Sequence, residues 1–320
     1  GGLNVCATRP ARPSQPRVST RVSGLVGVLR PDHPVMTITV VDHTEPRWAS
    51  VYARRGRENG AATYSREIVK HHIPVWRSVL PRGSLVSTCP LLINRDVRAP
   101  LIVQYLHTFI YDDPLRDIRR GSEWLANRCD RLVFVTAYRS LRDLAVAAGF
   151  EAVFVPMTLD AEPVRKHRAG KSFRKGCAIY FGNVTKTKES AYERTMTALR
   201  EAGWNVDVIS NGRMGSRQLT QSEAWEVISH YRYGVGVGRC LLEMQALGLR
   251  VLVSGVEFGG LMADEADWVA QRSANFGGRV ATWNRDPRLC VEGWDAAIIR
   301  DPDPPSLAAV TIDEWAASQR

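Results

Sequence analysis

One stretch of the sequence, residues 233–255, joins three regularly spaced glycines to a single acidic residue. Gly234, Gly236 and Gly238 can adopt backbone angles that are closed to other residues, so their repeat predicts a turn with exposed N–H groups at a helix start. Because the positive end of a helix dipole favours anions, a phosphate suits that turn. Glu243 falls about one turn into the predicted helix, on the side that can reach the same ligand. We therefore expect a loop, a helix and a strand that bind a nucleotide-type ligand.

The spacing in this stretch excludes two common phosphate-binding motifs. Its glycines do not follow the dinucleotide pattern, and the Gly-Lys-Ser at residues 170–172 has Arg165 where a P-loop has its first glycine. The stretch instead resembles the donor-site signature of GT-B glycosyltransferases of the large retaining group, roughly Glu-Gly-Phe-Gly-x-x-x-x-Glu-Ala-Met-Ala-x-Gly-x-Pro-Val. The positions that match in register are Gly236, Gly238, Glu243, Ala246, Gly248 and Val251.

The resemblance implies a role for each end of this signature. In the family the second glutamate is associated with the ribose of the nucleotide, which assigns that role to Glu243. The first glutamate, associated with the transferred sugar, is replaced by Val235, so the sugar contacts stay open. Arg239 stands at the predicted helix start, where it either pairs with a diphosphate or is a plain surface arginine.

A second part of the resemblance lies near the start of the C-terminal half. The family opens its C-terminal domain with a strand that ends in Gly-Arg, followed five residues later by a lysine, and this cationic pair holds the departing diphosphate. Lys188 matches the lysine, whereas Asn183 takes the place of the arginine. Fixed cations stabilise the charge that grows on a leaving phosphate. The alternative for Lys188 is a surface lysine at a helix start.

Three polar residues follow predicted strands nearer the N-terminus. Asp42 and His43 follow the alternating apolar residues 36–41, and ligands collect beyond strand ends in open α/β sheets. Both are therefore candidates for acceptor contacts or proton transfer, with helix or turn capping as the alternative. His107 follows the predicted strand 101–106, and the resemblance implies that His107, rather than His43, contacts the donor sugar; a turn histidine is its alternative.

The elements that must position these residues alternate between strand and helix along the chain, which predicts an α/β fold with doubly wound, mostly parallel sheets. We expect helices over residues 63–72 and 189–201, and capping boxes at residues 220–223 and 311–314 predict two further helix starts. A polar segment at residues 160–175 predicts a linker. The resemblance implies two Rossmann-like domains with an interdomain cleft, residues 36–165 for the acceptor and 170–320 for the nucleotide sugar.

Composition agrees with a globular enzyme. The 320 residues are 44% hydrophobic, which suffices for two cores, and no apolar run reaches the roughly 18 residues of a membrane span. Six cysteines lie far apart without zinc spacing, so we expect reduced thiols, no metal site and a cytoplasmic location. No cofactor is expected beyond a nucleotide-sugar donor, for which a UDP-sugar is our first expectation.

The charge leaves the acceptor open. The formal net charge is +10, and residues 1–160 hold 22 Lys and Arg against 14 Asp and Glu. A basic half of this kind attracts nucleic acid, an anionic membrane surface or a phosphorylated acceptor. We expect transfer to a hydroxyl of a lipid-linked, saccharide or small acceptor. The alternatives are a DNA glycosyltransferase that acts on a hydroxymethylated base and a non-catalytic nucleotide-binding protein of the same fold.

The first 35 residues are rich in arginine, proline and serine, and they predict a disordered basic tail that ends before the strand at Met36. Deletion of residues 1–35 should therefore leave the cooperative thermal unfolding of the protein unchanged, as followed by circular dichroism. Loss of the cooperative transition would show that this segment belongs to the folded body.

Overall fold

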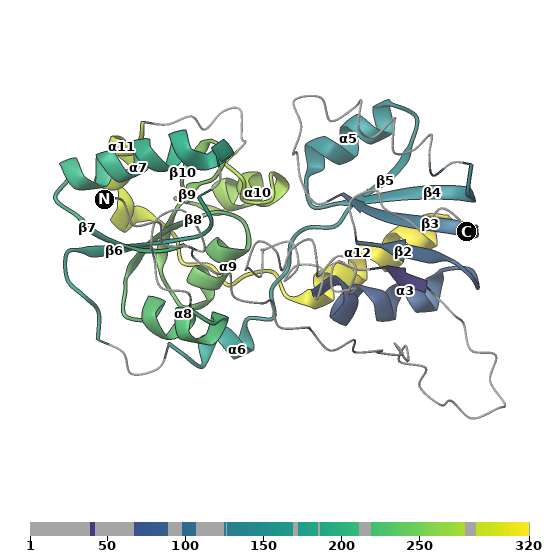
Figure 1. The fold of residues 1–320 in the computed structure, drawn as a ribbon, viewed down its shortest axis with the longest axis horizontal. Helices are drawn as coiled ribbons and strands as arrows, with labels where there is room; N and C mark the ends of the chain where they lie inside the picture. Colours follow the sequence, from purple (N-terminus) through teal and green to yellow (C-terminus); the bar gives the residue numbers. More distant parts are fainter. Residues whose placement is uncertain are drawn as a thin grey trace, which may run out of the picture. The chain divides into compact units, whose positions relative to one another are not determined.

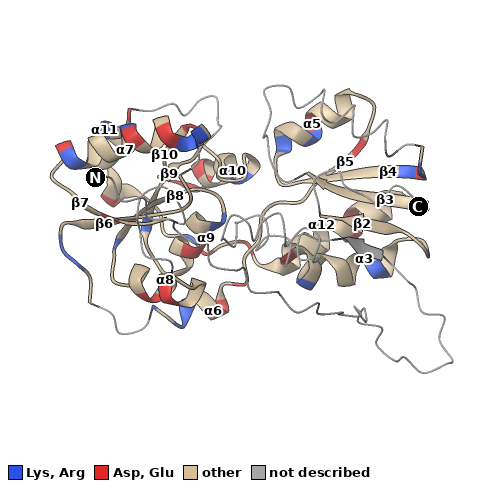
Figure 2. Cartoon of the chain, viewed as in Figure 1, with Lys and Arg blue, Asp and Glu red and all other residues tan. Residues whose placement is uncertain are grey.

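The chain forms two five-stranded sheets whose central strands are rich in buried apolar residues, because strands covered on both faces must be apolar. The computed structural model describes residues 39–41 (backbone only), 67–88, 98–106, 125, 127–168, 172–184, 186–210, 219–278 and 286–319. These ranges lie within one compact unit, Met36–Arg320. Figure 2 shows that charged residues concentrate on helices and loops, whereas the strands carry few.

The first sheet is wholly parallel, and its strands follow one another in chain order. Its longest ladder pairs β3 with β4, from Ala99 opposite Cys129 to Leu106 opposite Thr136. The strands are β1 (Thr39–Val41), β2 (Leu85–Ser87), β3 (Ala99–Leu106), β4 (Cys129–Thr136) and β5 (Glu151–Phe154). Because the order of these strands never reverses, they do not show the doubly wound arrangement expected for this half of the chain.

Helices from distant parts of the sequence pack beside the first sheet (Figure 1). They are the π-helix η1 (Ile68–His72), α3 (Ile73–Val79), α5 (Arg139–Ala147) and the C-terminal α12 (Pro305–Ser318). Trp76 of α3 meets Trp315 of α12 edge to face at 5.4 Å between ring centroids. The Trp315 indole N–H also donates to Glu151 of β5 at 3.0 Å. The terminal helix therefore packs toward the first half of the chain.

Two predicted helix boundaries are wrong. The helix expected to stop at residue 72 continues through a π-helical turn into α3, in which Pro74 occupies the first turn, where proline is tolerated. The terminal helix begins at Pro305 rather than at the capping box of residues 311–314. There the Thr311 hydroxyl donates to the Leu307 carbonyl inside the helix, at 2.9 Å.

A buried polar cluster joins η1 and α3 to β3. The Tyr105 hydroxyl accepts from Trp76 Nε1 and lies 2.9 Å from His72 Nδ1. Burial and neighbouring His71 lower the pKa of His72 to about 4, so the ring is neutral in the fold.

The second sheet reverses its strand order at β6. Its strands are β6 (Cys177–Phe181), β7 (Asn205–Ile209), β8 (Tyr233–Gly236), β9 (Arg250–Ser254) and β10 (Phe258–Leu261), in the spatial order β10-β9-β8-β6-β7. β6 pairs in parallel with β7 on one side and with β8 on the other. The sheet is mostly parallel, as predicted, and β10 at one edge runs antiparallel to β9. Three residues join these two strands, too few for the crossover of about a dozen residues that parallel neighbours need.

The helices of the second half lie on both faces of this sheet, with α7 and α11 on one face and α8 and α9 on the other (Figure 1). They are α7 (Glu189–Glu201), α8 (Gln221–Ile228), α9 (Arg239–Ala246), α10 (Glu265–Ser273) and α11 (Pro287–Glu292), with the short turns η2 (Lys186–Lys188) and η3 (Trp294–Ala296). The predicted helix 189–201 and the capping box at Thr220 are confirmed. The expected linker contains a short helix, α6 (Glu162–Arg165), whose Val164 is buried.

A glycine turn after α10 closes against the connection between β9 and β10. Gly278 has φ +80°, and a Cβ at this position would overlap the Glu257 carbonyl oxygen. The Val256 N–H donates to the Gly277 carbonyl at 3.2 Å, which fixes the two segments together. Gly278 is therefore required both for its backbone angles and for the close approach of two chain segments.

Gly278→Ala should lower the free energy of unfolding by about 1–3 kcal/mol more than Gly203→Ala, because only the first variant overpacks the backbone. Gly203 is a matched control, since its φ is +79° and nothing lies within 4 Å of an added Cβ. Denaturant unfolding of both variants measures the difference. Equal losses would contradict the packing role given to Gly278.

Candidate functional site

The reversal of strand order at β6 marks the candidate site. The connections that leave β6 and β8 depart toward opposite faces, because the chain moves from β6 to β7 in one direction and from β8 to β9 in the other. Open α/β sheets bind ligands beyond the carboxyl ends of strands at such a switch point. The two strand ends lie side by side, since Phe181 pairs with Gly236. Residues that follow these two positions therefore border the candidate site.

Helix α9 begins at this edge, but the predicted glycine turn is shorter than expected. Only Gly238 lies in the turn, with φ +57°, and its N–H donates to the Phe276 carbonyl at 3.0 Å. Gly234 and Gly236 are buried residues of β8, and a Cβ at either would come within 2.5 Å of Met244. Those two glycines thus let α9 pack closely on its own strand and do not offer N–H groups to a ligand.

The absence of a first signature glutamate has a packing reason. Val235 lies in the middle of β8 and is fully buried. It belongs to an apolar cluster that includes Tyr180, Leu252 and Phe258. An acidic side chain at this position would be enclosed by apolar groups, which is costly without a charged partner.

Lys188 supplies the positive charge at the end of β6. It is the last residue of η2 and the N-cap of α7. Burial lowers the pKa of its ammonium group, and no carboxylate among the described residues forms an ion pair with it. Asn183, which follows Gly182 at the end of β6, is part-buried. A part-buried cation without a carboxylate partner is suited to receive an anionic ligand.

Cys240 of α9 interacts electrostatically with Lys188 at the start of α7 and with Arg239 and Glu243 of its own helix. Burial and, to a lesser degree, the nearby Glu243 carboxylate raise the pKa of its thiol to about 12, although Lys188 and Arg239 oppose the rise. A thiol with so high a pKa is neutral at physiological pH and is a poor nucleophile. The structure therefore brings together three of the predicted site residues, Lys188, Arg239 and Glu243, around a neutral thiol.

Glu243 is the most enclosed of these residues, at 2% exposure. Its Oε1 accepts from Gln221 Nε2 and from Arg239 Nε, both at 2.7 Å. Its Oε2 accepts from the Trp225 indole N–H at 2.9 Å. The carboxylate therefore lies in a polar setting within the protein, and its contacts in the structure are protein groups.

Arg239 connects Glu243 to the other half of the chain. Its Nη2 lies 3.6 Å from Oε1 of Glu67, the residue immediately before η1. The other carboxylate oxygen of Glu67, Oε2, lies 3.3 Å from His71 Nε2. The buried Nη1 of Arg239 makes no hydrogen bond with the described residues. Arg239 thus pairs with the carboxylates of Glu67 and Glu243, and its Nη1 group is left without a hydrogen bond to the described residues.

Several residues of this cluster were not predicted, and the remaining predicted residues cannot be located. Glu67, Gln221, Trp225 and Cys240 were not singled out, although the confirmed capping box at Thr220 places Gln221 and Trp225 on one helix. Asp42, His43 and His107 lie outside the described residues.

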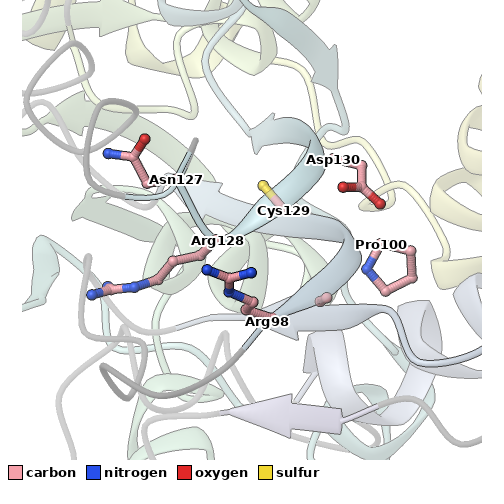
Figure 3. A pocket seen from close by; sticks show the side chains of 7 residues that line it. Arg98, Pro100, Asn127, Arg128, Cys129 and Asp130 are labelled. Atoms are coloured by element: carbon pink, nitrogen blue, oxygen red, sulfur yellow. The ribbon is translucent and has the colours of Figure 1, made fainter.

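The pocket shown in Figure 3 lies in the first sheet, at the amino ends of its strands. It has a volume of about 480 Å³ and lies where β3 and β4 begin, with Arg98, Pro100, Asn127 and Asp130 among its lining residues. Ligands of open α/β sheets bind beyond the carboxyl ends of the strands, whereas these are amino ends. Its size therefore does not make it the candidate site.

Comparison of the chain with protein-family models and with curated proteins gives no match. Within the described ranges, no three His, Cys, Asp or Glu side chains are arranged to hold a metal ion. None of the helices in those ranges combines the length and apolar character that crossing a bilayer requires. The four cysteines of the described residues are free thiols.

Glu243→Gln should lower the free energy of unfolding by about 3 kcal/mol or more, because it leaves the buried Arg239 short of its nearest carboxylate. Glu151→Gln is a matched control. Glu151 also accepts from an arginine and an indole, but its side chain is 28% exposed, so we expect a loss of about 1 kcal/mol or less. Denaturant unfolding measures both losses, and a smaller loss for Glu243→Gln would contradict the structural role of the pair.

Proposed function

We propose that this protein is a glycosyltransferase that moves a sugar from a nucleotide-sugar donor to an acceptor hydroxyl. The observation that carries the proposal is the position of the part-buried Lys188 and the start of α9 at the β6–β8 switch point. A diphosphate suits such an edge, since a helix start and an ammonium group both favour negative charge.

In this proposal, Lys188 and the start of α9 supply the groups that stabilise the departing diphosphate during sugar transfer. When the bond between the anomeric carbon and the diphosphate oxygen breaks, negative charge grows on that oxygen. In our proposal Lys188 stabilises this charge, and no carboxylate of the described residues holds its ammonium group in an ion pair. The anomeric carbon then forms its new bond to the acceptor oxygen, and the proton of the acceptor hydroxyl passes to the departing diphosphate or to water. The acceptor hydroxyl of our proposal belongs to a lipid-linked, saccharide or small molecule.

The second candidate is a nucleotide-binding protein without transferase activity. It is favoured by the buried Val235, which leaves the place of the sugar-associated glutamate without an acid. It is also favoured by the enclosed Glu243–Arg239 pair, whose groups already bind one another at 2.7 Å. This candidate predicts nucleotide binding at the same edge and no transfer or hydrolysis of the sugar.

A thermal-shift screen with UDP-, GDP-, ADP- and CDP-sugars tests the proposal, since a ligand that binds the folded state raises the unfolding temperature. At least one donor should stabilise the protein, and that donor should be hydrolysed or should give up its sugar to an acceptor. Lys188→Met should weaken donor binding about tenfold or more, because hydrogen bonds to charged groups contribute about 1.5–3 kcal/mol.

Lys175→Met is the matched control, because Lys175 is exposed and precedes the opposite end of the same strand, β6. It should bind the donor as the unaltered protein does. Binding without turnover would favour the second candidate. Equal effects of the two lysine variants, or no stabilisation by any donor, would refute the site.

A further inference from the structure

Two arginines lie next to one another where the strands β3 and β4 begin. Arg98 and Arg128 directly precede Ala99 and Cys129, the first paired residues of the two strands. The Ala99 N–H donates to the Arg128 carbonyl at 3.0 Å, which joins the two segments. Because neighbouring strands lie about 4.8 Å apart, the backbone holds the two arginines close together. The sheet therefore places two positive charges side by side at its amino edge.

These two charges are not balanced in the way that a third arginine of the same sheet is. Like charges at neighbouring strand positions repel one another. Arg131 of β4 is neutralised by Glu151 of β5, at 2.6 Å. Arg98 is exposed, and no carboxylate of the described residues forms an ion pair with it. An anion that bound Arg98 and Arg128 together would relieve their repulsion.

Both arginines line the pocket of about 480 Å³ that Figure 3 shows, whose volume is in the range of small-molecule sites. In that view Arg98, Arg128 and Asn127 lie on one side, whereas Pro100 and Asp130 lie on the other. Guanidinium and amide groups offer N–H donors, whereas an ionised carboxylate only accepts. The pocket thus has a cationic end for an anion and an acidic end for a hydroxyl or amino group.

We propose that this pocket is a second ligand site, separate from the β6–β8 edge, and that it binds an organic phosphate with one phosphate group and at least one hydroxyl. Two guanidinium groups suit a phosphate, because each can form two parallel hydrogen bonds to its oxygens. Asp130 accepts from the hydroxyl, and its carboxylate repels a second phosphate group. The diphosphate of a nucleotide sugar is therefore not the ligand of this pocket.

Calorimetric titration of the full chain with glucose 6-phosphate and with inorganic phosphate tests the proposal. Both probes should bind, and glucose 6-phosphate should bind at least about tenfold more tightly, because its hydroxyls also donate to Asp130. Arg98→Met should weaken the binding of glucose 6-phosphate about 10- to 100-fold, as expected when hydrogen bonds to a charged group are lost.

Asp130→Asn tests the acidic end of the pocket independently of the arginines. Removal of its negative charge should strengthen the binding of inorganic phosphate about threefold or more, because the carboxylate no longer repels the anion. This variant also keeps the proposal testable should Arg98→Met fail to fold cooperatively, since both Arg98 and Arg128 are unaltered in it. Weaker or unchanged binding of inorganic phosphate would contradict the position given to Asp130.

Arg194→Met is the matched control, because Arg194 is an exposed arginine of α7, in the other half of the chain. It should leave the binding of glucose 6-phosphate unchanged, and so should Lys188→Met, which alters the β6–β8 edge. Absence of binding by both probes, equal affinities of the two probes, or equal losses for Arg98→Met and Arg194→Met would overturn the proposal. A loss in Lys188→Met as large as in Arg98→Met would also overturn it, since the phosphate would then bind at the β6–β8 edge.

Discussion

The buried ion pair between Arg239 and Glu243 is the interaction on which the candidate site depends. A charged side chain can be enclosed only when its hydrogen-bonding groups find partners, and Glu243 finds its three on α8 and α9. The pair therefore fixes two helices to one another beside the end of β8. Through Glu67, Arg239 also connects this edge to the π-helix of the first half. Single-turn π-helices are frequent at functional sites, which agrees with this position.

Two positively charged residues, Arg239 and Lys188, consequently lie near the carboxyl ends of β6 and β8, and their roles differ. Arg239 is neutralised by two carboxylates, so its first role is structural. Lys188 pairs with no carboxylate of the described residues, and burial lowers its pKa, so an incoming anion would relieve an unfavourable position. Because of this difference, we propose that the diphosphate binds at Lys188 rather than at Arg239.

Much of the second half of the chain was predictable from local sequence signals. Gly248 ends α9 with φ +81°, and the strand and helix that surround Lys188 lie where the alternation of apolar residues places them. The sequence did not reveal that Gly234 and Gly236 belong to a strand, because their role is to admit Met244, a contact between elements. It also gave no signal for Glu67, whose partner Arg239 is far away along the chain. The antiparallel strand β10 was not predicted, because its direction relative to β9 follows from the three-residue connection between the two strands.

A crystal structure of the protein with a bound nucleoside diphosphate would show where the donor binds. We expect the diphosphate to lie within hydrogen-bonding distance of Lys188 Nζ and of the first N–H groups of α9. A nucleotide bound elsewhere, for example in the pocket beside Arg98 at the amino ends of β3 and β4, would contradict it.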